Sequence, residues 1–204
     1  MRKVKITRNN IIVLLSIILI TICLFIKIND SYRQVKEERN EQNAINELID
    51  KKVDTTIENK VKLSRNMNNK TNNKYNYIAV LEIPKIGLKR GLVMATKNFK
   101  SINYAVSIDN NSKFPDEIGN FILYAHSGNS KMSYFDNIKK LTNNDVVKVY
   151  YENVWYTYQI FDKYEITKGT NLKIYNDGKN KYITLVTCSQ EDKSKQIILL
   201  GKEG

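Results

Sequence analysis

The stretch Tyr182-Ile-Thr-Leu-Val-Thr-Cys188 runs into a polar segment, Ser189-Gln-Glu-Asp-Lys-Ser-Lys-Gln196, after which a second apolar run, Ile197-Ile-Leu-Leu200, begins. Both apolar runs are short and rich in β-branched residues, which is typical of strands. The polar segment between them has the composition of a loop. We therefore expect two strands joined by a loop, with Cys188 at the end of the first strand.

Short runs of this kind recur from residue 76 onward, separated by Gly, Asn, Asp and Pro. Eight such runs in this part of the chain predict a mainly β fold, either a small barrel or a sandwich. One or two helical turns are also expected between Tyr134 and Leu141, where apolar residues share a helical face. The expected strands cover residues 77–83, 91–94, 120–125, 145–151, 154–160, 163–166, 182–187 and 196–200.

The N-terminus carries an apolar segment without charges, Ile11 to Ile26, preceded by four basic and no acidic residues in Met1 to Arg8. With the flanking residues to Ile28 it approaches the roughly 20 residues that span a bilayer as a helix. No small-x-small cleavage site follows it, so we expect an uncleaved signal anchor rather than a removed signal peptide. By the positive-inside rule the N-terminus is cytoplasmic and the remainder lies outside a cell membrane.

The region between this segment and the strands reads as a stalk. Ile45, Ile49, Val53, Ile57 and Val61 recur at intervals of four and place an apolar stripe on one helical face. The stripe could belong to a stalk, to a self-association seam, or to a helix lying on the following domain. An asparagine-rich spacer follows. The expected domains are thus residues 1–28 (tail and anchor), 29–75 (stalk and spacer) and 76–204 (the folded domain).

The chain has a net charge of +12, but the lysines of its C-terminal part are mixed with acids and do not cluster with aromatics. This distribution indicates a mildly cationic surface beside an anionic membrane or wall polymer, and it argues against a nucleic-acid partner. The two cysteines, Cys23 and Cys188, are far apart in sequence and unsuited to a disulfide framework.

Two lone reactive residues end strand-like runs: Cys188, and His126, the single histidine of the chain. A free cysteine is often only a small buried hydrophobe, and a lone histidine is often structural. An unpaired thiol outside the membrane is nevertheless exposed to oxidation, and nucleophilic catalysis with a neighbouring imidazole gives a reason to keep it. One Cys and one His supply too few ligands for the usual metal site, so we expect neither metal nor cofactor.

Three segments resemble motifs of the sortase family. Leu81-Glu-Ile-Pro-Lys-Ile-Gly87 is similar to its opening strand, Gly119-Asn-Phe-Ile-Leu-Tyr-Ala-His126 to its histidine motif, and Thr184-Leu-Val-Thr-Cys188 to its Thr-Leu-x-Thr-Cys motif. The resemblance covers roughly residues 76–204 and implies an eight-stranded β-barrel outside a Gram-positive type membrane. It also implies a cysteine transpeptidase that cuts a Leu-Pro-x-Thr-Gly type sorting signal through a thioester and passes the secreted protein to an amine of the peptidoglycan precursor.

By this resemblance Cys188 is the nucleophile and His126 the general acid and base. The third family residue, an arginine on the last strand, is missing, because no Arg follows Cys188. Lys195 is our first candidate to replace it, for its charge, and Gln196 is the second. A slip of one residue in strand register exchanges which of the two faces the site. Both residues could instead be solvated residues of an edge strand.

The chain lacks the Asp-Pro-aromatic plug of pilus-building sortases and the long helical insertion of class B, so the resemblance is closer to a compact class A or D domain. The sequence predicts a membrane-anchored enzyme that attaches secreted proteins to the cell wall. Two alternatives remain open: a sortase-like binding module with weak or no turnover, motivated by the missing arginine, and a simple cysteine peptidase that releases its product to water.

Overall fold

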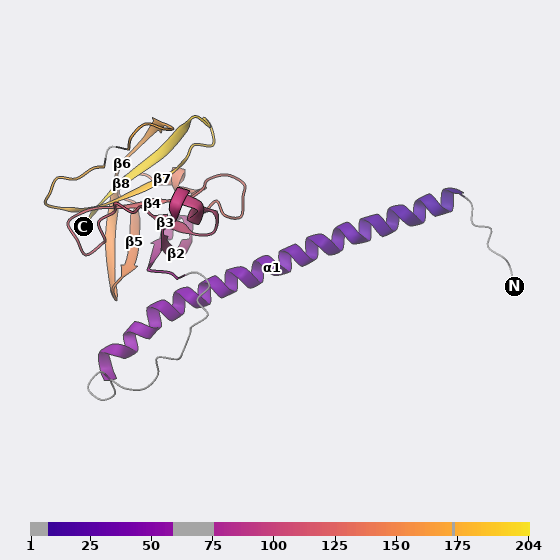
Figure 1. The fold of residues 1–204 in the computed structure, drawn as a ribbon, viewed down its shortest axis with the longest axis horizontal. Coiled ribbons are helices and arrows are strands. Elements are labelled where there is room, and N and C mark those ends of the chain that lie inside the picture. The colour runs from indigo at the N-terminus through magenta and orange to yellow at the C-terminus, as the bar shows by residue number, and fades with distance from the viewer. Residues whose placement is uncertain (1–7, 59–75, 173) are drawn as a thin grey trace. The chain divides into compact units, whose positions relative to one another are not determined.

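The computed structural model describes residues 8–58, 76–172 and 174–204. In the first of these ranges it describes side chains only for residues 12–50, and in the other two it describes all of them. The described chain begins with one long helix, α1 (Arg8–Glu58), and continues as a β-domain (Figure 1). Two compact units divide the chain, Met1–Asn43 and Ala44–Gly204. The asparagine-rich spacer predicted before residue 76 lies outside the described residues.

The β-domain is a closed barrel of eight strands in the order β1-β2-β3-β4-β7-β8-β6-β5. Neighbouring strands are antiparallel except for two parallel pairs, β2 with β3 and β4 with β7. The predicted barrel is therefore confirmed. The strands are β1 (Ala79–Ile83), β2 (Leu88–Met94), β3 (Val106–Ile108), β4 (Gly119–Tyr124), β5 (Val146–Tyr151), β6 (Val154–Thr167), β7 (Lys181–Cys188) and β8 (Lys195–Glu203).

The predicted number of strands is correct, but two of the predicted strands differ from the observed ones. The runs 154–160 and 163–166 are one strand, β6, whose pairing with β8 shifts register between Ile160 and Asp162. The irregularity interrupts the alternation of apolar and polar residues, which made the strand look like two. The short β3 was missed because three residues are too few to show a period.

Short 3-10 helices fill some of the connections: η1 (Pro84–Ile86), η2 (Lys97–Asn103) and η3 (Ile138–Lys140). The helical turns expected between Tyr134 and Leu141 are reduced to η3, although the expected apolar face is buried, with Phe135, Ile138 and Leu141 fully enclosed. The β5–β6 hairpin turns through Glu152 and Asn153, both with positive φ, as a tight two-residue turn requires.

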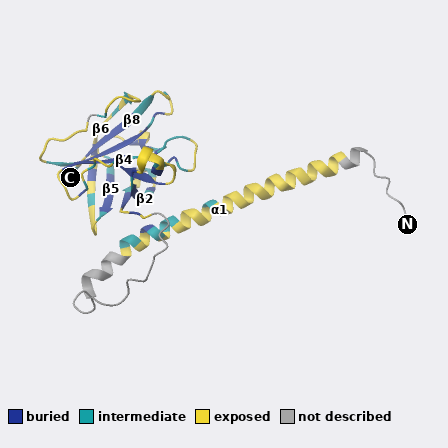
Figure 2. Cartoon of the chain, viewed as in Figure 1, coloured by how far each residue is buried: buried dark blue, intermediate teal, exposed yellow. Residues whose placement is uncertain are grey.

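Two layers of apolar side chains lie on opposite sides of the strands β4, β7 and β8. The barrel interior contains Phe121, Leu123, Leu185 and Leu199, and the strands carrying them are dark blue in Figure 2. The alternate residues face outward and form a second cluster, whose buried members are Ile122, Val186, Ile198 and Leu200. This outward side of β4, β7 and β8 is called the site face below, because it continues to His126 and Cys188.

A third cluster of buried residues includes part of the apolar stripe of α1. Ile45 is fully buried against Val80 of β1, Val93 of β2 and Tyr150 of β5, with Leu48 and Ile49 packed at the margin. The Tyr150 hydroxyl donates a hydrogen bond to the Ile49 carbonyl at 3.3 Å. Three roles were considered for the stripe, and residues 44–49 have the role of a helix that lies on the domain. The structure does not describe the side chains of the other residues of the stripe.

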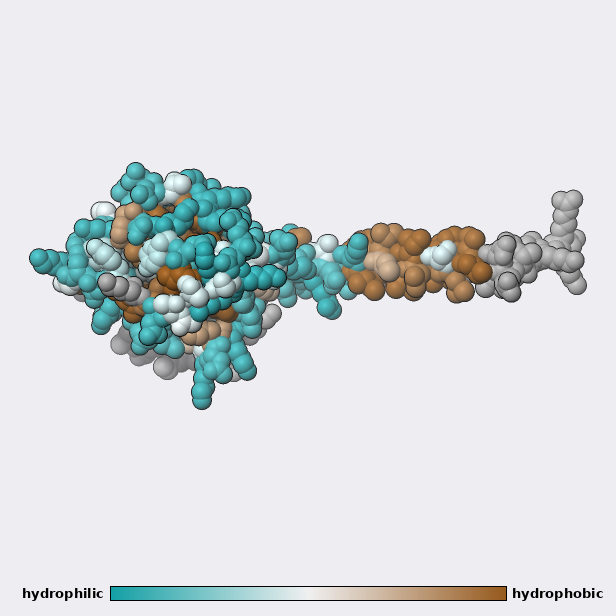
Figure 3. Space-filling model, turned by 90° about the horizontal axis from the view of Figure 1, so that it is seen from above, coloured by the Kyte–Doolittle hydropathy of each residue, from teal (hydrophilic) through white to brown (hydrophobic). Residues whose placement is uncertain are grey.

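The apolar part of α1 is long enough to cross a membrane. Within Ile12–Asp50 it contains a window of mean hydropathy 2.6, none of it buried against protein. Figure 3 shows the apolar part of the helix as a mostly brown, hydrophobic band with a pale patch within it, and the part nearer the β-domain as hydrophilic. The helix is compatible with a single-pass membrane anchor, as the sequence predicted.

Candidate active site

The strand register brings His126 and Cys188 to the same end of two neighbouring strands. β4 and β7 run in parallel and pair Tyr124 with Val186, and each candidate residue lies two positions further along its chain. Side chains two apart in a strand share a face, so His126 and Cys188 continue the site face at the same level. Neighbouring strands are spaced about 4.8 Å apart, so the backbones of these two residues lie close together.

Hydrogen bonds hold the two chain segments together beyond the last paired residues. The Ala125 N–H donates to the Val186 carbonyl at 3.3 Å, and the buried Thr187 hydroxyl donates to the Ala125 carbonyl at 2.8 Å. The Ser127 hydroxyl donates to the Cys188 carbonyl. The residues on both sides of His126 are therefore tied to the strand that ends in Cys188. Cys188 is a free, partly exposed thiol.

Asn103, the last residue of η2, orients the histidine. The distance between His126 Nε2 and Asn103 Oδ1 is 3.0 Å. An amide oxygen only accepts hydrogen bonds, so Nε2 carries a proton in this arrangement. The Nδ1 atom is then the ring nitrogen that can exchange a proton with a reactant.

Gln196 and Lys195 are separated by the register of β8. Gln196 is the direct cross-strand partner of Cys188, so both side chains are on the site face. Lys195 is on the other face, where its Nζ lies 3.4 Å from Glu165 and 3.8 Å from Asp192. The geometry thus favours Gln196, the second candidate of the sequence analysis, as the residue beside the thiol.

The site face next to these residues carries a cluster of apolar side chains. Leu172, in the connection from β6 to β7, packs against the outward cluster, as do Tyr124 and Tyr164. Burial, with the nearby Asp109 carboxylate as a smaller cause, raises the pKa of Tyr124 to about 12, so this phenol is neutral at physiological pH. Such a surface suits apolar side chains of an extended peptide.

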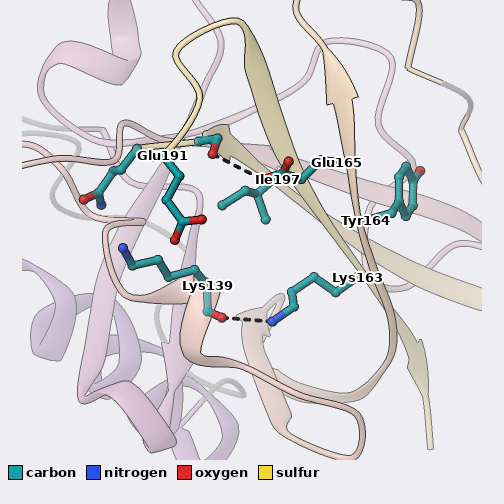
Figure 4. A pocket seen from close by; sticks show the side chains of 8 residues that line it. Lys139, Lys163, Tyr164, Glu165, Glu191 and Ile197 are labelled. Atoms are coloured by element: carbon teal, nitrogen blue, oxygen red, sulfur yellow. Dashed lines mark hydrogen bonds between the residues drawn. The ribbon is translucent and has the colours of Figure 1, made fainter.

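A separate hollow of about 270 Å³ lies beside the loop that follows Cys188 (Figure 4). Glu165 and Glu191 contribute carboxylates, and Lys163 donates from its Nζ to the Lys139 carbonyl at 2.9 Å. Neither His126 nor Cys188 lines this hollow, and Ile197 on its wall belongs to the barrel interior. The hollow is therefore not the place where the thiol would meet a substrate.

The site residues predicted from the sequence do not include Asn103 or Ser127. Asn103 is exposed in a connection that has neither a strand nor a helix period, so the local sequence gives no signal for it. Ser127 contacts the Cys188 carbonyl only because β4 and β7 pair, which the local sequence does not show. Across the described side chains, no group of three or more His, Cys, Asp or Glu residues is placed to hold a metal ion.

Comparison with known proteins identifies the family. A family model described as the sortase domain matches residues 81–203. Sortase A of Bacillus anthracis is 23% identical over 177 residues, which cover 84% of this chain and 83% of that protein.

Solved sortase structures share the barrel. Sortase C-1 of Actinomyces oris superposes with a TM-score of 0.58 at 20% identity, covering 63% of this chain and 74% of the other. The sortase D5 transpeptidase of Clostridium perfringens gives a TM-score of 0.54 at 22% identity, covering 62% and 78%. The family model spans more than half of the chain, and the chain therefore belongs to the sortase family, whose members are sorting transpeptidases.

Proposed function

We propose that this chain is a membrane-anchored cysteine transpeptidase that cleaves a Leu-Pro-x-Thr-Gly type sorting signal and transfers the protein that carries it to a cell-wall amine. The observation that carries the proposal is the parallel register of β4 and β7, which aligns His126 with Cys188 on one face. The apolar site face beside them would accommodate the leucine and proline of such a signal.

In the first half-reaction the Cys188 thiol gives its proton to His126, and the sulfur attacks the carbonyl carbon of the scissile peptide bond. The new C–S bond forms a thioester, the C–N bond breaks, and His126 passes this proton to the departing amine. In the second half-reaction an incoming amine attacks the thioester, His126 takes a proton from that amine, and the thiolate leaves and recovers the proton from His126. Asn103 holds the ring through Nε2, so Nδ1 serves as the proton-exchanging atom.

Gln196 would act where the family has its arginine. Its side-chain amide can donate a neutral hydrogen bond to the carbonyl oxygen of the substrate as negative charge develops there. It has neither the charge nor the paired donors of a guanidinium, so oxyanion stabilisation should be weaker.

The test is capture of the thioester. Full-length protein in detergent is incubated with sorting-signal peptides and examined by mass spectrometry for an acyl adduct on Cys188, followed by transfer when an amine is added. Wild type should form the adduct, whereas Cys188→Ala and His126→Ala should not. Release to water that is unchanged by added amine would indicate a simple peptidase instead.

The neutral Gln196 also favours a second candidate, a sortase-like module that binds sorting signals with little turnover. Peptide binding by the wild type without any adduct, together with a large gain of activity in Gln196→Arg, would support it over the transpeptidase.

A further inference from the structure

Asp136 joins the loop that carries the histidine to the loop that follows the cysteine. Its Oδ1 atom accepts a hydrogen bond from the Gly128 backbone N–H at 3.1 Å, and the side-chain amide of Gln190 donates to the same oxygen. Gly128 lies two residues after His126, and Gln190 lies two residues after Cys188. One carboxylate oxygen therefore bridges the segments on either side of the site.

Other contacts also restrain the histidine loop, including the burial of Phe135 in the barrel core. The Phe135 N–H donates to the His126 carbonyl at 2.9 Å, which closes the loop on itself. Ser127 reaches the Cys188 carbonyl, which ties its beginning to β7. The contact between Asp136 and Gln190 adds a link at the far end of the loop, between two side chains that belong to no strand.

We propose that Asp136 and Gln190 are positioning residues, whose hydrogen bond fixes the histidine loop against the cysteine loop and so sets the separation of imidazole and thiol. The inference rests on the proposed function, in which these two groups exchange protons with one substrate. A carboxylate acceptor makes the bond stronger than one between neutral groups. Small displacements of reacting groups cost rate steeply, by up to about a hundredfold for 1 Å.

If the hydrogen bond between Asp136 and Gln190 only stabilised the fold, its loss would lower the melting temperature. Gln190 is exposed and Asp136 only partly buried, so their bond adds little to global stability. Disrupting it should therefore change the reactivity of the thiol while the melting temperature stays nearly constant. The chemistry also permits an exchange of partners, because an amide and a carboxylate can swap positions and keep the bond.

The experiment measures the rate of Cys188 alkylation by iodoacetamide across a range of pH. It uses the full chain with Cys23→Ser, which leaves Cys188 as the single thiol. The variants are Gln190→Glu, which sets two carboxylates against each other, and the exchange Asp136→Asn/Gln190→Glu. Gln159→Glu is the matched control, since this exposed residue pairs with Lys202 on β6 and β8. His126→Ala defines the profile of a thiol without its imidazole.

Gln190→Glu should move the pH profile toward that of His126→Ala and lower sorting-peptide turnover by about tenfold or more. The exchanged pair should restore both, and Gln159→Glu should match the wild type. A wild-type profile in Gln190→Glu, or failure of the exchange to restore it, overturns the inference and leaves the proposed function standing. If the wild type itself does not turn over the sorting peptide, the proposed function fails, and the positioning role fails with it.

Discussion

Gln196 is the residue that the strand register places beside Cys188. It lies opposite Cys188, while Lys195 faces the other side with Glu165 and Asp192. The sequence-based prediction ranks Lys195 first for its charge, but the sequence does not fix the register, because apolar residues follow both candidates without interruption and a slip of one position exchanges the faces. The choice follows only from the pairing of β8 with β7.

We expect Gln196→Ala to lower the rate of thioester formation by about tenfold to a hundredfold, since a donor to the developing oxyanion is lost. Lys195→Ala should change the rate far less, because its ammonium group faces away from Cys188. Gln196→Arg should preserve or raise the rate. Single-turnover kinetics with a sorting-signal peptide measure all three, and a larger loss in Lys195→Ala than in Gln196→Ala would contradict the assignment.

Asn103 gives the second prediction for a single residue. Asn103→Leu removes the oxygen that accepts from His126 Nε2 and leaves the ring free to rotate. The value of kcat should fall by about tenfold, with little change in KM, because the substrate does not contact this residue in the proposed reaction. Asn103→Asp keeps an acceptor and should lose less. An equal loss in both variants would argue against orientation through this oxygen.

Polar contacts hold the connection between β6 and β7 in place, and the pattern of apolar and polar residues in the sequence does not predict these contacts. The buried Asn120 amide donates to the Tyr175 carbonyl at 2.9 Å and accepts from the Thr184 hydroxyl, also at 2.9 Å. The sequence correctly predicts that Asn120 and Thr184 lie in strands. It does not predict that they hold the connection between β6 and β7, because this depends on the pairing of β4 with β7.

The turn that ends this connection makes an acid-sensitive contact. The Tyr182 hydroxyl donates to Asp177 at 2.7 Å, and with Asn180 it holds the pKa of the Asp177 carboxyl well below its usual range. A lowered folded-state pKa stabilises the protein above the unfolded value of about 3.9, and the contribution is lost as pH falls below it.

Asp177→Asn should therefore lower the melting temperature at pH 7, and the difference from wild type should shrink at pH 3. Thermal unfolding followed by circular dichroism at both values checks this, with Asp116→Asn as an exposed control on another turn. A difference that persists unchanged at pH 3 would show that the carboxylate charge is not the cause.

The docked part of α1 contributes to the stability of the barrel unit. Ile45→Ala deletes a fully buried side chain packed on Val80 and Tyr150, and should cost about 2 to 4 kcal/mol of unfolding free energy. Trp155, the single tryptophan, contacts the Tyr150 ring at 5.2 Å and gives the fluorescence signal for urea unfolding. Val35→Ala, on an exposed part of the same helix, should be neutral. Equal stability of the two variants would mean that the helix does not dock in solution.

At the scale of the whole molecule, the separation into an apolar helix and a mainly β domain follows from the sequence pattern, because a charge-free apolar segment and short alternating strands are strong signals. The closed order of the strands does not, since a barrel and a sandwich share the same pattern of short runs. The orientation across the membrane rests on the four basic residues of the N-terminal tail and remains a prediction.

The two cysteines allow that orientation to be measured, because Cys188 belongs to the barrel and Cys23 to the apolar part of α1. A membrane-impermeant maleimide added to intact protoplasts should label the Cys23→Ser variant, in which only Cys188 remains. It should not label Cys188→Ala, whose single thiol is shielded by lipid. Replacing Arg2, Lys3, Lys5 and Arg8 by Glu should abolish or reduce external labelling, because the positive charges expected to retain the tail in the cytoplasm are gone. Labelling of Cys188 only after lysis would place the barrel on the cytoplasmic side, away from secreted proteins and wall precursors.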